Sequence, residues 1–187
     1  MFGEPIILIN NNIFLVGPMG VGKTTIGRHI ADEIGLTFID SDREIENRTG
    51  VEIPLIFEFE GEIGFRKREQ AVITELTTLS NIILSTGGGV ILNAQNRHYL
   101  QTRGYVIYLH AAVEDLLERT AHSRSRPLLQ IENPRIRLEQ IMTERHPLYQ
   151  SVAHVTIETG HRTIRQVVRA VLRHLRKILG KDEHITS

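Results

Sequence analysis

Short runs of apolar residues alternate along this chain with segments whose apolar residues recur at helical spacing. The runs that predict buried strands are Ile13–Val16, Thr37–Ile39, Ile82–Ser85, Tyr105–Leu109 and Val152–Ile157. Strand-like runs that alternate with helical segments are typical of α/β proteins with a parallel sheet. The pattern therefore predicts an α/β fold.

The spacing of the apolar residues also predicts where helices lie. Ile26, Ile30 and Ile34 recur every four residues and are followed by Gly35, which indicates a helix with a glycine C-cap. Further helices are expected over Asp42–Thr49 (ended by Gly50), from about Pro54, and from about Ile63 to Leu79 with Val72, Leu76 and Leu79 facing the core.

A last helix is predicted from about Thr163 to Leu179. One face carries Val167, Val168, Val171, Leu172, Leu175 and Ile178, and the other carries Arg162, Arg165, Arg169, Arg173 and Arg176. A basic amphipathic helix can bind membranes or nucleic acid, but such helices more often pack on a core and leave the charged face in solvent. We adopt the second interpretation.

The stretch from Ala121 to Arg135 differs from the rest of the chain. It is polar and rich in arginine, contains Pro127 and Pro134, and has weak periodicity. These features predict a mobile loop or lid inserted into the sheet domain, with a plain surface connection as the alternative.

Length and composition narrow the class of protein. A chain of 187 residues corresponds to a single domain. The 22 basic and 22 acidic residues cancel, which argues against sequence-independent binding to nucleic acid. The absence of cysteine excludes disulfides, thiolate zinc sites and cysteine nucleophiles. No apolar run approaches the roughly 18 residues of a membrane span, and no signal-peptide pattern is evident, so we expect a cytoplasmic protein that does not bind membranes.

The segment Gly17-Pro18-Met19-Gly20-Val21-Gly22-Lys23-Thr24 fits the phosphate-binding loop pattern G-x-x-x-x-G-K-[ST]. It lies between a predicted strand and a predicted helix, as a true example must. The glycines allow backbone N–H groups to surround a β-phosphate, and the helix N-terminus adds partial positive charge. Lys23 is expected to bridge the β- and γ-phosphates, and the Thr24 hydroxyl to bind Mg²⁺.

Nucleotide binding alone does not separate a kinase from a GTPase or a motor. The chain has no N-K-x-D motif for guanine, and neither Ile82–Ser85 nor Tyr105–Leu109 ends in the Asp-Glu pair usual in motor ATPases. The small size, the single phosphate-binding loop and the arginine-rich segment favour a small-molecule kinase.

Two further segments follow predicted strands. Asp40 and Asp42 lie after the second strand, at the edge where open parallel sheets bind ligands. Two residues apart on an extended segment, their side chains should point the same way. Helix capping is the alternative, and Asp42 is a candidate cap.

Gly87, Gly88 and Gly89 follow the third strand. Three glycines are costly in chain entropy, which favours close approach of backbone N–H groups to a substrate over a simple wide turn.

Six segments together are similar to the shikimate kinase family. They are GPMGVGKTTIG (17–27), FIDSDREIENRTG (38–50), IFEFEGEIGFRKRE (56–69), ILSTGGGVIL (83–92), RTAHSRSRPLL (119–129) and ERHPLY (144–149). The resemblance runs from Gly17 almost to the end of the chain. It implies a three-layer P-loop kinase fold of the nucleoside monophosphate kinase type, with a five-stranded parallel sheet and a mobile lid. It also implies transfer of the ATP γ-phosphoryl to the 3-hydroxyl of shikimate, a step of aromatic amino-acid biosynthesis.

The resemblance implies a role for each matching residue. Lys23, Asp42 and Arg126 are the expected catalytic residues, with Asp42 as proton acceptor and Arg126 closing over the transferred phosphoryl group. Thr24 and Asp40 are the expected Mg²⁺ residues. The expected ATP-binding residues are Gly20, Val21, Gly22, Lys23, Thr24, Thr25, Arg119, Arg126 and Arg162, of which Arg119 and Arg162 would lie on the two sides of adenine. The expected shikimate-binding residues are Asp42, Arg66, Gly87, Gly88, Gly89 and Arg145, with Arg66 and Arg145 holding the carboxylate.

Two other functions stay open on the sequence. A kinase for another small hydroxy acid, such as gluconate, could use the same carboxylate clamp. A catalytically inactive nucleotide-binding regulator could share the fold. We expect a monomer that binds ATP and shikimate, and we assign no role to residues 1–12.

Overall fold

The computed structural model describes residues 11–121 and 133–178. A parallel sheet of five strands in the order β2-β3-β1-β4-β5 forms the middle layer. The strands are β1 (Ile13–Val16), β2 (Thr37–Asp40), β3 (Ile82–Ser85), β4 (Tyr105–His110) and β5 (Val155–Glu158). The predicted α/β fold with a five-stranded parallel sheet is therefore confirmed, and β1 and β3 have the predicted bounds.

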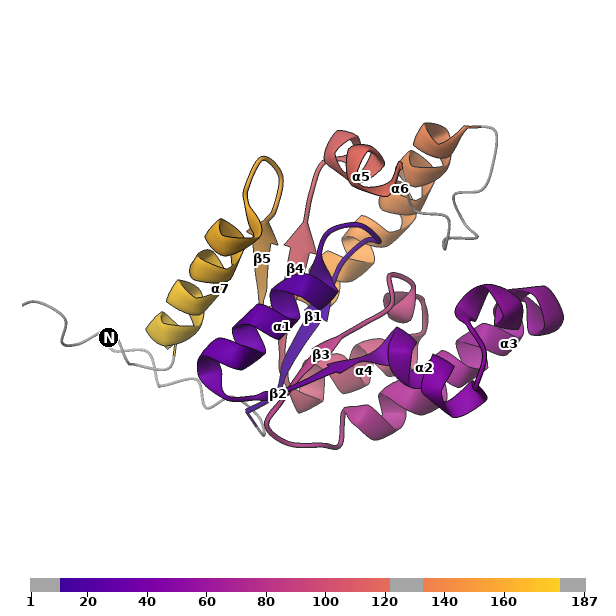
Figure 1. Cartoon of the computed structure of the whole chain (residues 1–187), viewed down its shortest axis with the longest axis horizontal. Coiled ribbons are helices and arrows are strands. Elements are labelled where there is room, and N and C mark those ends of the chain that lie inside the picture. Colours follow the sequence, from indigo (N-terminus) through magenta and orange to yellow (C-terminus); the bar gives the residue numbers. More distant parts are fainter. Residues whose placement is uncertain (1–10, 122–132, 179–187) are drawn as a thin grey trace, which may run out of the picture.

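Helices cover both faces of the sheet (Figure 1). They are α1 (Lys23–Ile34), α2 (Ser41–Thr49), α3 (Ile53–Leu76), α4 (Ala94–Arg103), α5 (Val113–Thr120), α6 (Pro134–Val152) and α7 (Ile164–Ile178), with a short 3-10 turn, η2, at Val90–Leu92. Within the described ranges, no helix has both the length and the apolar character needed to span a membrane.

The two faces of the sheet bury two separate apolar clusters. Ile13 and Leu15 of β1 face α1 and α7, whereas Phe14 and Val16 face α3, α4 and α6. All four of these side chains are fully buried. A strand buried on both faces has a continuous apolar run instead of an alternating one, which is why β1 was recognisable in the sequence.

Glycines end several helices as predicted. Gly35 and Gly50 follow α1 and α2 with φ of 71° and 72°, a left-handed conformation that glycine adopts without strain. Gly61, with φ of 66°, interrupts the helical path of α3. The two predicted helices in this region are therefore the two parts of α3 on either side of Gly61.

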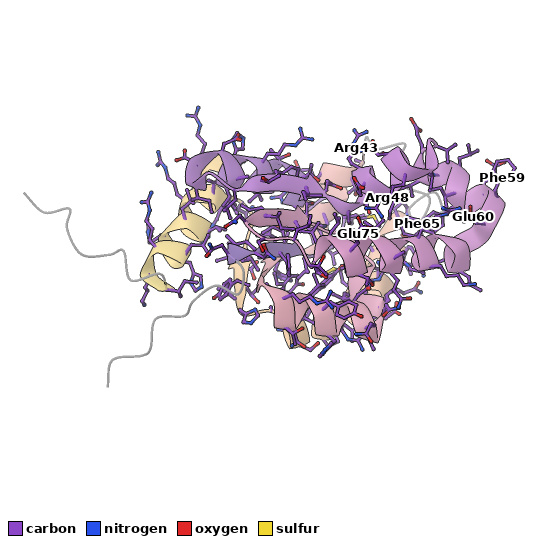
Figure 2. All side chains as sticks on the ribbon, turned by 90° about the horizontal axis from the view of Figure 1, so that it is seen from below. Arg43, Arg48, Phe59, Glu60, Phe65 and Glu75 are labelled. Carbon is purple, nitrogen blue, oxygen red and sulfur yellow. The ribbon has the colours of Figure 1, made fainter. Side chains whose placement is uncertain are left out.

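The part of the chain formed by α2 and α3 extends away from the sheet (Figure 1). Arg48 of α2 donates to Glu75 near the end of α3 at 2.8 Å and 3.0 Å, and these side chains link the two helices (Figure 2). Phe59 and Glu60 lie at the far tip of this projection (Figure 2). The start of α2, by contrast, directly follows Asp40 at the carboxyl end of β2.

Three predicted boundaries are wrong. Leu79 is 41% exposed, because α3 ends at Leu76 and Leu79 belongs to the loop before β3, where its carbonyl accepts a hydrogen bond from Asn12 at 2.6 Å. Val152 ends α6, so β5 begins only at Val155.

The third boundary is the end of the predicted lid. Pro134 and Arg135 begin α6, because Asn133 caps that helix and Arg135 binds Glu114 and Glu139. The central part of the predicted lid, residues 122–132, lies outside the described residues.

The last helix packs as predicted. Val167, Val171 and Leu175 of α7 are buried in the cluster on the α1 side of the sheet. Its arginines are exposed. The core-packing interpretation of this basic helix is confirmed.

Candidate active site

A cavity of about 690 Å³ lies at the carboxyl ends of β1, β2 and β3. Its lining comes from the phosphate-binding loop, the start of α2, both parts of α3, the Gly87–Gly89 loop, Arg119 and Arg145. Ligands of open α/β sheets bind at this edge, and the cavity is the place where segments far apart in the sequence meet.

The phosphate-binding loop is held in shape by its own lysine. Gly17, Gly20 and Gly22 have positive φ values of 144°, 80° and 98°. A Cβ atom at Gly17 would lie 2.3 Å from the Leu109 carbonyl oxygen, so only glycine fits there. Lys23 Nζ donates to the carbonyls of Gly17 and Pro18 at 2.7 Å and 2.9 Å. The loop is therefore curled around a buried ammonium group.

Oxygen atoms from three elements gather beside this loop. Thr24 Oγ1 donates to Asp40 Oδ2 at 2.7 Å and lies 3.5 Å from Ser85 Oγ. Hydroxyl and carboxylate oxygens are the protein ligands that suit Mg²⁺, which otherwise keeps waters and phosphate oxygens in its shell. Among the described residues no group of three or more histidine, aspartate or glutamate side chains could hold a metal alone. The donors present fit a magnesium ion brought in with a nucleotide.

The two aspartates do not share one extended segment. Asp40 ends β2 and caps α2, because its Oδ1 accepts from the N–H groups of Asp42 and Arg43 at 3.0 Å and 3.3 Å. Asp42 lies in the first turn of α2, so its expected extended placement and its capping role are both wrong. Both carboxylates still line the cavity.

The far end of the cavity contains a buried cluster of charges. Arg66 donates to Glu69 at 2.8 Å and to Glu62 at 3.0 Å. Arg145 donates to the Gly88 carbonyl at 3.2 Å. Glu69 is 1% exposed and Arg145 is 4% exposed, although both line the cavity.

Three buried atoms of side chains that line the cavity have no hydrogen-bond partner among the described residues. They are Asp42 Oδ1, Glu69 Oε1 and Arg145 Nε. Buried polar atoms are nearly always paired, so three unpaired atoms beside one cavity indicate that a polar ligand belongs there.

Burial, together with the nearby carboxylates of Asp40 and Glu69, raises the pKa of Asp42 to about 7 against the opposing charge of Lys23. Burial also raises the pKa of Glu69, opposed by Arg66 and Arg145. Perturbed carboxyl groups in a cleft are typical of sites that transfer protons.

The Gly87–Gly89 loop approaches charged side chains closely. A Cβ at Gly89 would lie 2.3 Å from the Arg66 guanidinium nitrogens, and one at Gly87 would lie 2.7 Å from Asp42 Oδ1. A side chain at either position would displace one of these charged groups, whereas the predicted approach of the loop to a substrate stays a prediction. The Gly87 N–H group, however, donates to Ser41 Oγ at 3.1 Å instead of pointing to a substrate.

Comparison with known proteins adds to this geometry. The family model described as "Shikimate kinase" matches residues 19–176. This chain belongs to the shikimate kinase family. The curated shikimate kinase of Nitrosococcus oceani is 56% identical over 173 residues, which cover 92% of this chain and 91% of that protein. That of Acinetobacter baylyi is 54% identical over 92% of this chain and 94% of that protein.

A solved structure agrees with this assignment. The shikimate kinase from Acinetobacter baumannii in complex with shikimate superposes with a TM-score of 0.86 at 50% sequence identity, over 92% of this chain and 95% of that chain. The predicted family and its P-loop kinase fold are thereby confirmed.

Most of the residues predicted for a shikimate kinase meet in the one cavity. The lining includes Gly20, Gly22, Lys23, Thr24, Thr25, Asp40, Asp42, Arg66, Gly87, Gly88, Gly89, Arg119 and Arg145. Arg119 donates to the hydroxyl and the carbonyl of Thr159 at 3.1 Å and 2.8 Å, which ties it to the loop after β5.

Two predicted residues, Val21 and Arg162, do not line the cavity. The Val21 side chain is buried in the core beneath the phosphate-binding loop, so only its backbone could reach a phosphate. Arg162 is exposed and does not line the cavity. Arg126 lies outside the described residues.

Sequence reasoning missed Ser41, Glu69 and Tyr149, although each lies inside a segment quoted for the resemblance. Glu69 carried a readable signal, because it interrupts the stripe of buried residues on α3 that includes Phe65, Val72 and Leu76. A charged residue on the apolar face of a helix requires a partner, and here the partner is Arg66.

Proposed function

We propose that this chain transfers the γ-phosphoryl group of ATP to the 3-hydroxyl of shikimate, giving shikimate 3-phosphate and ADP in aromatic amino-acid biosynthesis. The observation that carries the proposal is a cavity that joins a phosphate-binding loop to Asp42, Arg66 and the buried Arg145. A kinase needs this juxtaposition of donor and acceptor sites because positioning and charge stabilisation supply most of its catalysis.

At the donor end, the N–H groups of Gly20, Val21 and Gly22 and the Lys23 ammonium would bind the phosphates, with Thr25 beside them. Thr24 and Asp40 would hold Mg²⁺, which neutralises charge on the β- and γ-phosphates when bound. Arg119 would contact adenine. Arg126 and Arg162 stay predictions as further ATP-binding residues.

At the acceptor end, Asp42 would accept the proton of the attacking hydroxyl. A bond forms between that oxygen and the γ-phosphorus, the bond to the bridging oxygen breaks, and ADP leaves. The loose transition state of phosphoryl transfer asks little of the base. With its pKa raised to about 7 by burial, Asp42 is nevertheless better suited to accept a proton than an exposed carboxylate.

Arg66 and Arg145 would bind the acceptor's carboxylate. A guanidinium group forms paired hydrogen bonds with a carboxylate, and the partnerless Nε of Arg145 is one donor available for it. Asp42 and the glycine loop would face the hydroxyl groups. This combination suits a compact cyclic acid with several hydroxyls better than an open-chain acid such as gluconate.

The proposal is tested by ADP release from purified protein with ATP, Mg²⁺ and a panel of acceptors that includes shikimate, quinate and gluconate. We expect kcat/KM for shikimate to exceed that for every other acid by about 100-fold or more, and mass spectrometry to identify shikimate 3-phosphate. Preference for gluconate would support the other kinase function. ATP binding without ADP release for any acceptor would support an inactive regulator.

The expected monomeric state and cytoplasmic location stay predictions.

A further inference from the structure

The Gly87–Gly89 loop is held at two consecutive residues by neutral hydroxyl groups from different helices. Ser41, in the first turn of α2, accepts a hydrogen bond from the Gly87 N–H at 3.1 Å. Tyr149, near the end of α6, donates its hydroxyl hydrogen to the Gly88 carbonyl. Ser41 and Tyr149 are both fully buried.

The Gly88 carbonyl is a shared anchor. It accepts from Tyr149 and also from Arg145 Nη1 at 3.2 Å. Both donors bond to the same carbonyl oxygen. The Tyr149 hydroxyl therefore helps to position the peptide group to which the Arg145 guanidinium is hydrogen-bonded. Among the described residues, Arg145 Nε is buried and has no hydrogen-bond partner.

The loop also lies directly against the phosphate-binding loop and Arg66. A Cβ at Gly88 would lie 3.3 Å from the Met19 backbone nitrogen and 3.6 Å from the Gly17 carbonyl oxygen. The Arg66 guanidinium is packed still more closely against Gly89, where a Cβ would lie 2.3 Å from its terminal nitrogens. A shift of this loop would therefore change the spacing between the acceptor's arginines and the phosphate-binding loop.

We propose that Ser41 and Tyr149 are positioning residues for the phosphoryl acceptor, acting through the two peptide groups of the Gly87–Gly89 loop. Neither residue lines the cavity. The inference rests on the proposed function, since it assigns the loop and Arg145 to the acceptor. Misplacement of a substrate by about 1 Å can lower its rate of reaction by as much as 100-fold, so two hydrogen bonds on such a loop are sufficient to matter.

The test replaces only the hydroxyl groups. In Tyr149→Phe and Ser41→Ala we expect kcat/KM for shikimate to fall about tenfold, mainly through KM, while KM for ATP stays within about twofold. Because both residues act on one loop, the double variant should lose less than the product of the two single losses.

Tyr108→Phe is the matched control. Tyr108 is also fully buried and its ring stacks on Tyr149 with centroids 4.9 Å apart, but its hydroxyl bonds to His146 at 2.9 Å. Loss of that hydroxyl should lower the melting temperature without changing KM for shikimate. A Tyr149→Phe protein with a lower melting temperature but an unchanged KM would overturn the proposal, as would an equal rise of KM in Tyr108→Phe.

The proposed function is tested separately, by measurements on the wild-type protein. If the wild type phosphorylates a different hydroxy acid, the choice of shikimate is wrong, and the same variants measured with that acid decide the positioning role. If the wild type binds an acceptor without turnover, acceptor binding is measured by calorimetry instead. Ser41→Ala and Tyr149→Phe should then weaken this binding about tenfold, whereas Tyr108→Phe should not change it.

Discussion

Lys23 bonds to carbonyls only five and six positions away, at the phosphate-binding end of the cavity, whereas Arg145 and Tyr149 bond to Gly88 across 57 and 61 positions at the acceptor-binding end. The first end is one continuous loop whose backbone conformation creates the site. The second end is assembled from α2, α3, α6 and the glycine loop. The comparison suggests that the phosphate end is determined locally and the acceptor end by tertiary packing.

The two ends also differ in how charge is held. The Lys23 ammonium donates to two neutral backbone carbonyls and acts against the rise in the pKa of Asp42. At the acceptor end, buried Glu69 lies beside Arg66 and Arg145, and the local balance of charge depends on all three. Removal of one partner of a buried ion pair is costly because the other charge stays buried. Variants at the acceptor end should therefore affect one another more than variants at the phosphate end.

Asp42 lies between the two ends, so its substitution should affect catalysis more than either binding step. For Asp42→Asn we expect kcat to fall about 1000-fold, within the range for loss of a general base. KM for ATP should stay within about threefold. Exposed Asp32 on α1 provides the control as Asp32→Asn, which should retain full activity. A collapse of ATP affinity with unchanged acceptor affinity would instead place Asp42 in the magnesium site.

Lys23→Ala tests the phosphate end. We expect kcat to fall at least about 100-fold, or about 2.7 kcal/mol of transition-state stabilisation, because the charge that follows the γ-phosphoryl group is lost. Acceptor binding measured by calorimetry should change little. Exposed Lys67 on α3 is the control, as Lys67→Ala. Near-normal turnover in a folded Lys23→Ala protein would refute the role of this loop.

Arg66→Lys tests the acceptor end. The charge remains but the planar fork is lost, so KM for shikimate should rise about 10- to 100-fold while KM for ATP moves little. For a shikimate analogue with a neutral amide in place of the carboxylate, the same substitution should raise KM much less. Arg68→Lys, on the exposed pair with Glu60, should behave as wild type. Equal losses for acid and amide would mean that Arg66 supports the site without binding the carboxylate.

Glu69→Gln tests whether the acceptor end depends on its supporting charges. The amide keeps the size of the side chain but weakens the hydrogen bond and removes the ion pair with Arg66. We therefore expect KM for shikimate to rise about tenfold with ATP kinetics unchanged. Glu60→Gln, at the exposed ion pair with Arg68, is the control and should have no effect on KM. An unchanged KM in Glu69→Gln would contradict the difference drawn between the two ends.

The features that could be predicted from the sequence are those that depend on neighbours in the chain. The strands β1 and β3 were predicted with their bounds because they are continuous apolar runs. The helix ends at Gly35 and Gly50 were predicted because glycine adopts the left-handed conformation there. Helices α4, α5 and α6 were not predicted. Helix α4 buries few apolar side chains, so it leaves no apolar pattern in the sequence. It begins after Asn93, whose capping role is evident only from its hydrogen bonds.

The sequence by itself determined the α/β class, the phosphate-binding loop and, through six motifs, membership of the shikimate kinase family. Only the tertiary structure decided that Arg145 and Tyr149 bond to one carbonyl of the glycine loop and that Ser41 bonds to the same loop. The physical reason is the range of the interactions. Backbone conformation and apolar periodicity act over a few residues and leave a pattern in the chain. A buried hydrogen bond between residues 61 positions apart leaves none until the sheet brings its partners together.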